Sequence, residues 1–118
     1  MDNDTLIMTM LFDFFGDLLS DKQREYFDLY YNDDLSLSEI AERNGISRQG
    51  VYDTISRAEK SLTEMEEKTG VIKRWLKMRS EIDQAMLHAD HLMRLCGVES
   101  DAAQIIRELV LILDNLKQ

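Results

Sequence analysis

Apolar side chains recur along this chain at intervals of three and four residues, which predicts a succession of amphipathic helices. Residues 35–62 organise the rest, because their pattern predicts a short helix, a tight turn that contains glycine, and a longer helix. That order is the helix-turn-helix pattern. The apolar positions of its second helix are spaced by 4, 3 and 4 residues: Val51, Ile55, Ala58 and Leu62.

Polar residues mark the ends of both helices of this motif. Ser36 and Glu39 have the spacing of a capping box, in which each side chain accepts from the backbone amide of the other residue. Gly45 suits the left-handed conformation that ends a helix, and Ser47 can cap the next helix. We expect Ile46 to fill the core between the two helices.

Two further helices are predicted before the motif. The first spans residues 4–19 and carries a wide apolar stripe that we expect to be buried: Leu6, Ile7, Met10, Leu11, Phe14, Phe15 and Leu18. The second spans residues 21–31 and begins at a capping box formed by Ser20 and Gln23. It is expected to bury Tyr26, Phe27, Leu29 and Tyr30.

Two more helices are predicted after the motif. Residues 71–96 have a three-heptad apolar stripe typical of coiled-coil packing: Val71, Trp75, Met78, Ile82, Ala85, Ala89, Leu92 and Cys96. Gly97 ends this helix, and a last helix that starts at Asp101 is too apolar to stand alone. Two arrangements stay open, a homodimer through residues 71–116 or an antiparallel hairpin within one chain. We therefore expect a helix-turn-helix domain over residues 1–68 and a C-terminal helical region over residues 69–118.

Composition supports an all-α fold and a cytoplasmic protein. The 118 residues include no proline and suit one domain, or one small domain with a helical appendage. No apolar run reaches the ~18 residues of a membrane span, so no membrane partner is predicted. The N-terminus is acidic where a secretion signal would be basic. Cys96, the single cysteine, cannot form an internal disulfide and is expected to be a small buried hydrophobe.

Charge weighs against a simple DNA repressor. The formal net charge is −9, and residues 1–35 alone hold nine acidic and two basic side chains. Residues 36–62 hold four of each. A dedicated DNA-binding domain usually has a basic surface, because contacts with phosphates supply most of its affinity.

No enzyme signature is present, so we expect a non-enzymatic protein without a cofactor. The chain has no glycine-rich phosphate loop, no HExxH motif and no paired cysteines. His88 and His91, with Asp90 between them, supply three metal ligands at most, and no metal site is predicted. The polar turn at residues 32–34 lacks the ligand spacing of a calcium loop.

The candidate binding surface is the outer face of the second motif helix. A rotation of 100° per residue places eight side chains on or beside this face when Val51 points inward: Ser47, Arg48, Gln49, Tyr52, Asp53, Ser56, Arg57 and Lys60. On DNA, Arg48 could read guanine, Gln49 adenine and Asp53 a cytosine amino group. Ser47, Arg57 and Lys60 would hold phosphates. The alternative is an ordinary solvated helix face. Gly50 within this helix is expected to cost roughly 1 kcal/mol relative to alanine.

The motif resembles region 4 of the sigma-70 family and, more closely, the YlxM family of small bacterial helix-turn-helix proteins. The resemblance covers roughly residues 6–68, and four segments carry it: the aromatic segment 11–15, the helix junction LSDKQ, the segment SLSEIA, and SRQ followed by VYD. It implies a cytoplasmic bacterial protein that acts as an accessory or regulatory component of the signal recognition particle pathway. It implies no catalytic residues.

Two hypotheses follow. In the first, the motif binds nucleic acid, either the RNA of the signal recognition particle or DNA; on DNA, a dimeric transcriptional regulator would read half-sites with the helix over residues 48–60. In the second, the acidic protein docks on a basic protein surface such as the particle's GTPase.

Overall fold

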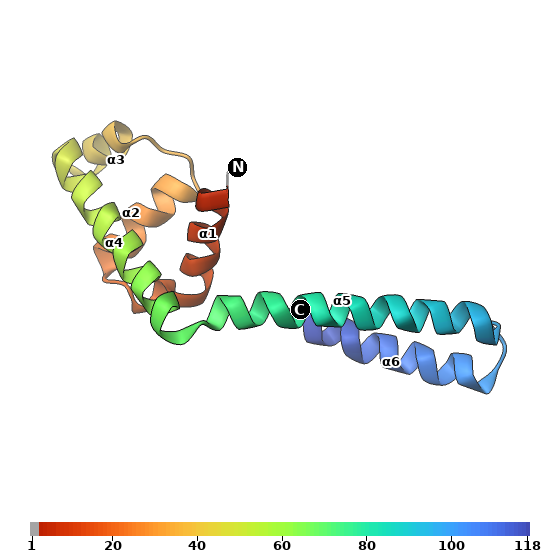
Figure 1. The fold of residues 1–118 in the computed structure, drawn as a ribbon. Coiled ribbons are helices and arrows are strands. Elements are labelled where there is room, and N and C mark those ends of the chain that lie inside the picture. Colours follow the sequence, from red (N-terminus) through yellow and green to blue (C-terminus); the bar gives the residue numbers. More distant parts are fainter. Residues whose placement is uncertain (1–2) are drawn as a thin grey trace. The chain divides into compact units, whose positions relative to one another are not determined.

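The computed structural model describes residues 3–118, which form helices and, within that range, no strand (Figure 1). The predicted all-α fold is confirmed. Contacts divide the chain into two compact units, one ending at Ile72 and one starting at Lys73. We call residues 3–72 the N-terminal unit and residues 73–118 the C-terminal hairpin. The helical elements in chain order are α1 (Asn3–Phe15), the 3-10 helix η1 (Gly16–Leu18), α2 (Asp21–Tyr31), α3 (Leu37–Asn44), α4 (Arg48–Thr69), α5 (Val71–Cys96) and α6 (Asp101–Lys117).

Helix α4 is the centre of the N-terminal unit. The four apolar positions that periodicity selected on this helix are at most 3% exposed: Val51, Ile55, Ala58 and Leu62. They join two apolar clusters. One cluster lies between α4 and the helices α1 and α2, around Phe27, and the other lies between α4, α2 and α3, around Ile40.

The predicted caps of α2 and α3 and the predicted end of α3 at Gly45 are confirmed. Ser20 with Gln23 and Ser36 with Glu39 form reciprocal capping boxes. Gly45 ends α3 with φ of 67°, and Gly70 ends α4 with φ of 61°. Both lie in the left-handed region, which glycine enters without the steric cost of a Cβ.

The first helix is shorter than predicted, and its buried face differs. α1 ends at Phe15, and the 3-10 helix that follows leaves Leu18 70% exposed while Leu19 is buried. Phe12, which the pattern placed off the buried stripe, stacks on Phe27 with ring centroids 4.7 Å apart. A Cβ at Gly16 would lie 3.1 Å from the Phe12 ring, so glycine lets this ring approach the backbone. Other stripe residues remain about half exposed: Leu6, Ile7 and Phe14.

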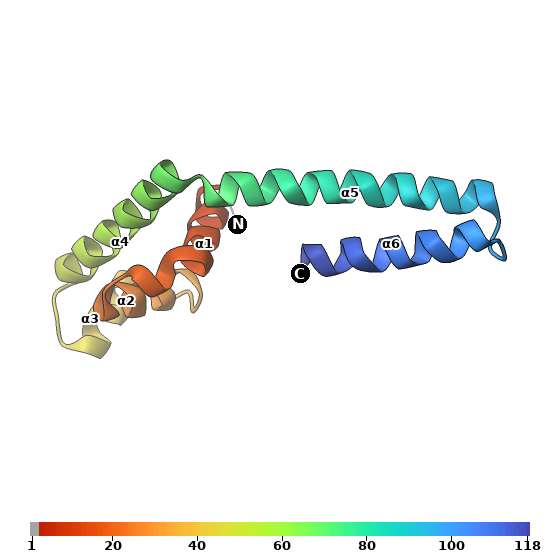
Figure 2. The ribbon, with the colours of Figure 1, turned by 90° about the horizontal axis from the view of Figure 1, so that it is seen from below.

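The C-terminal hairpin consists of α5 from Lys73 onward and of α6, which run antiparallel and side by side in both views (Figures 1 and 2). Gly97, with φ of 79°, ends α5, and the Ser100 side chain, rather than that of Asp101, caps α6. An ion pair of 2.6 Å joins Lys117 to Asp83 across the two helices. Of the two predicted arrangements, the chain itself contains the hairpin; the homodimer stays a prediction.

The apolar stripe of α5 is only partly covered within one chain. Ile82 and Ala89 are buried in the hairpin, whereas Met78 and Leu92 are 44% and 48% exposed. The expectation that Cys96 is buried is wrong, since its side chain is exposed at the end of α5. Among residues 3–118, no helix is long and apolar enough to cross a bilayer.

Candidate nucleic-acid interface

The candidate interface begins at the turn between α3 and α4. Ser47 caps α4, and its hydroxyl accepts a hydrogen bond of 3.0 Å from the Gly50 amide. The expectation that Ile46 fills the inter-helix core is wrong. Ile46 is 40% exposed, and its amide donates to the Ala41 carbonyl at 3.1 Å, which completes the turn after α3.

The glycine at position 50 has a local explanation. Gly50 is the third residue of α4, and a Cβ there would lie 3.2 Å from the Ser47 hydroxyl oxygen and 3.7 Å from the end of Ile46. A side chain would therefore press on the cap. The propensity cost that we expected falls in the first turn of the helix, at the residue whose amide donates to the cap.

The eight predicted residues lie together along one side of α4 and its cap. Seven are exposed and Ser56 is half-buried: Ser47, Arg48, Gln49, Tyr52, Asp53, Arg57 and Lys60 form the exposed set. Tyr52 is 52% exposed and gives the surface one aromatic ring. The opposite side of α4 is the buried apolar row described above, so this helix separates a core face from a solvent face.

Two polar residues of this face are already paired. The Gln49 amide nitrogen donates to the Asp53 carboxylate at 2.9 Å, one turn along the helix. We expected Gln49 and Asp53 to contact separate bases; the spacing of four residues permits the pair that forms instead. No ion pair in the described part of the chain involves Arg48, Arg57 or Lys60. Their charges face solvent and can meet an anion.

The charge of the chain is concentrated in its first part. Residues 1–72 hold 16 acidic and seven basic side chains, a net charge of −9, and residues 73–118 hold seven of each. The three cations of α4 therefore act against an acidic background. That background weakens long-range attraction to nucleic acid, especially at low salt.

One ionisable contact under the interface was not predicted. Glu59, next to Lys60, is half-buried against α2, where it forms a hydrogen bond with Tyr31. Burial raises the pKa of Glu59 above 4.5, and the hydrogen bond from Tyr31 opposes this rise. Because the contact joins residues 28 positions apart, no local pattern could have revealed it.

The histidines of the C-terminal hairpin form no metal centre with their neighbours. His88 and His91 are both exposed on α5. In the part of the chain that the structure describes, no group of three or more histidine, cysteine, aspartate or glutamate side chains is arranged to hold a metal ion.

Comparison with known proteins places the motif in a family. A family model described as "Putative helix-turn-helix protein, YlxM / p13 like" matches residues 2–96. A UPF0122 protein of Thermoanaerobacter sp. (strain X514) is 56% identical over 84 residues, which cover 71% of this chain and 72% of that protein. A UPF0122 protein of Geobacillus kaustophilus is 43% identical over 105 residues, covering 89% and 93%. One of Halalkalibacterium halodurans is 53% identical over 85 residues, covering 72% and 77%. The predicted resemblance is confirmed, and it extends past residue 68 through α5.

Proposed function

The chain belongs to the YlxM / p13-like family of helix-turn-helix proteins, and on that premise we propose that it is a non-enzymatic regulatory protein that binds nucleic acid through the outer face of α4. One observation carries the proposal. The inner row of α4 is buried, while its outer face presents a tyrosine and three cations. None of these cations forms an ion pair in the described part of the chain.

Each side chain has a role that follows from its position on the helix. Arg48 lies in the first turn, where a recognition helix meets base edges. Arg57 and Lys60 lie two and three turns further along and would contact phosphates, with Ser47 at the cap. Tyr52 and Ser56 lie between these positions and would contact the sugar–phosphate backbone.

The pairing of Gln49 with Asp53 limits sequence-specific recognition. Reading adenine with both groups of the Gln49 amide would require this amide to leave Asp53. The Asp53 carboxylate would also repel nearby phosphates. We therefore expect binding that depends mainly on phosphate contacts and has modest base preference.

The target that the family resemblance suggests is the signal recognition particle, with this protein as an accessory component. The RNA of the particle provides a helical, phosphate-rich surface. A DNA half-site is the alternative target. A docking helix whose cations contact phosphates can serve on either one, so the experiment compares both.

A second candidate function is docking on a basic protein surface, and the net charge of −9 in residues 1–72 favours it. The particle's GTPase is the partner that the resemblance suggests. Attraction between an acidic unit and a basic surface speeds association and weakens with salt.

A salt titration with matched variants tests the nucleic-acid proposal. Dissociation constants for a mixed-sequence DNA duplex and for the particle RNA are measured by fluorescence anisotropy. Two phosphate contacts from cations predict that affinity falls roughly 12-fold between about 50 and 200 mM salt. Arg57→Ala and Lys60→Ala should each lower the slope of log affinity against log salt by about one, whereas Arg48→Ala should weaken binding by an amount that depends on the base sequence.

Lys22→Ala is the matched control, because it removes an exposed cation of α2 that pairs with Glu25. This variant should leave the slope unchanged. If the wild type binds neither nucleic acid at the lowest salt, the proposal is wrong. Binding to the GTPase that survives the three α4 substitutions would support the second candidate instead.

A further inference from the structure

Helix α6 carries two apolar stripes, and α5 covers only one of them. The covered stripe is buried or half-buried: Ala103, Ile106, Val110 and Leu113. The second stripe has the same heptad spacing, one residue earlier in register, and its large members are 44–65% exposed: Ile105, Leu109, Ile112 and Leu116. A shift of one residue is a rotation of 100°, so the second stripe lies on an adjacent face of the helix.

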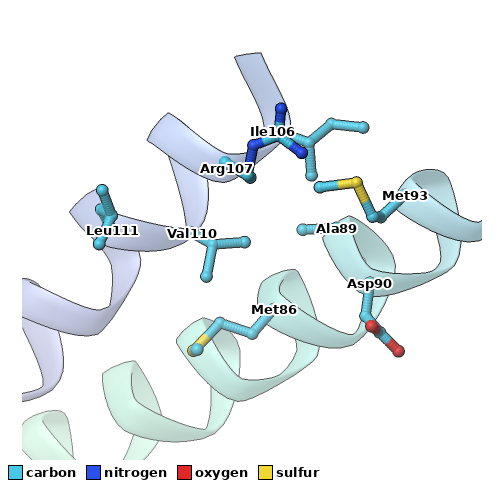
Figure 3. Close-up of a pocket in the computed structure, with 8 residues that line it drawn as sticks. All are labelled: Met86, Ala89, Asp90, Met93, Ile106, Arg107, Val110 and Leu111. Atoms are coloured by element: carbon cyan, nitrogen blue, oxygen red, sulfur yellow. The ribbon is translucent and has the colours of Figure 1, made fainter. Parts of the chain in front are cut away.

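Helix α5 repeats this arrangement. Ile82 and Ala89 are buried against α6. On one side of them, Met86 and Met93 line a cavity of about 550 Å³ together with Val110 of α6 (Figure 3). The other side carries Met78, Ala85 and Leu92. In an antiparallel pair of helices, the rotation per residue brings this side next to the second stripe of α6. We call the combined surface the open face: Met78, Ala85, Leu92, Ile105, Leu109, Ile112 and Leu116.

We propose that the open face binds the open face of a second copy of this chain, so that two hairpins form an antiparallel four-helix bundle. A helix with two adjacent apolar stripes is typical of such bundles, where every helix contacts two neighbours. The proposal is independent of what α4 binds.

The size of the open face suits a stable dimer. α6 has 17 residues and is therefore about 25 Å long, and two packed helices are about 20 Å wide. The projected area of the face is thus roughly 500 Å². Its accessible surface area is larger, because side chains protrude from the plane of projection. A standard protein interface buries about 800 Å² on each partner.

The charges of the hairpin favour a second copy and indicate its direction. The hairpin has no net charge, whereas residues 1–72 of a second copy would bring a charge of −9 to any contact. The base of the hairpin, residues 73–79 and 114–118, holds five basic side chains and one acidic. The tip, residues 90–108, holds four acidic and two basic. Pairing the tip of one hairpin with the base of the other brings opposite charges together.

The spacing of side chains along α5 agrees with this direction. Ala85 lies seven residues from both Met78 and Leu92, at the middle of the open face. In a tip-to-base pair, Ala85 would meet Ala85 of the second copy, and Met78 would meet Leu92. The small side chain at the centre allows the two α5 helices to approach closely.

Sedimentation equilibrium of the full chain tests the association. We expect a species of twice the 13.8 kDa of one chain. Leu109→Lys places a charge in the apolar contact and should weaken dimerisation at least about 100-fold, with the helical circular dichroism retained. Leu87→Lys is the matched control, because Leu87 is 70% exposed on α5 and outside the open face. It should leave the association unchanged.

Cross-linking at the exposed Cys96 tests the direction. In a tip-to-base dimer the two Cys96 thiols lie at opposite ends, so a short bismaleimide should not join wild-type chains. Lys77→Cys adds a thiol at the base and should give cross-linked dimers through Cys96 of the second copy. The same variant with Cys96→Ser should give none. A monomeric wild type, an equal loss of dimer in Leu87→Lys, or a wild-type Cys96 cross-link would each overturn the proposal.

Discussion

Phe27 and Leu109 are large apolar side chains in the middle of their helices, and they have opposite surroundings. Phe27 in the N-terminal unit is fully buried and stacks on two aromatic rings, with centroids 4.7 Å away at Phe12 and 4.3 Å away at Tyr31. Leu109 in the C-terminal hairpin is 44% exposed. In the N-terminal unit, the helices α1, α2 and α3 all pack against α4 and cover the core. The hairpin has only the contact between its two helices to bury apolar side chains.

The difference shows what the two regions need for stability. Four helices can surround an apolar core, and the acidic side chains of the N-terminal unit stay on its surface. Two helices can cover only one stripe each, and an isolated helical pair leaves the rest of its apolar surface in water. The hairpin has no net charge to keep copies apart, while residues 1–72 have a charge of −9.

The largest expected effect is the loss of unfolding free energy on truncating Phe27 in the closed core, compared with the same truncation of Leu109 on the open face. Phe27→Ala should lower the unfolding free energy of the N-terminal unit by about 3–5 kcal/mol, because it leaves a cavity among tightly packed rings. Urea titration followed by the methyl NMR signals of Val51 measures this unit alone. Leu109→Ala should leave that free energy unchanged. A loss below about 1 kcal/mol in Phe27→Ala would mean that the core is not closed as described.

A second experiment compares one backbone feature in both regions. Gly45→Ala should cost the N-terminal unit about 1–2 kcal/mol, since alanine is strained in the left-handed conformation. No atom lies within 4 Å of a Cβ at Gly45 or Gly97, so the cost comes from the backbone alone. Gly97→Ala should destabilise the hairpin and leave the Val51 signals unchanged. Equal effects of both variants on Val51 would show that the two units unfold together.

The smallest expected effect concerns the half-buried Glu59. Its pKa is higher in the folded state than its ordinary value, so ionisation at neutral pH costs stability that a protonated side chain would retain. Glu59→Gln should stabilise the N-terminal unit at pH 7 by less than about 1 kcal/mol, because the carboxylate stays partly solvated. The advantage should shrink as pH falls and vanish once the pH lies well below 4.5, where wild-type Glu59 is protonated in both states. A gain that persists at acidic pH would contradict the assignment of this cost to Glu59.

The sequence predicted the N-terminal unit well because its signals are local. Caps such as Ser36 and periodic positions such as Val51 depend on residues three or four apart, and the same rotation located the outer face of α4. It failed where a distant partner decides burial. Phe12 is placed by Phe27, and Leu18 is exposed because a 3-10 helix changes the register.

The hairpin marks the limit of periodicity. An apolar stripe predicts that a helix face is buried, but it does not identify the neighbour that covers this face. The pattern of residues 71–96 therefore predicted the helix correctly, whereas the prediction that Cys96 is buried was wrong. On α4, periodicity predicts the positions of Gln49 and Asp53, but it does not indicate their mutual hydrogen bond.

The short connection between α5 and α6 has a kinetic consequence. Only residues 97–100 separate the two helices, so their first contacts close a small loop, which costs little conformational entropy. Loops of this size close in well under a microsecond, and helices elongate in nanoseconds per residue. The two helices can therefore zip together from Ser100 towards Lys117 early in folding, before the slower packing of distant residues in the N-terminal unit.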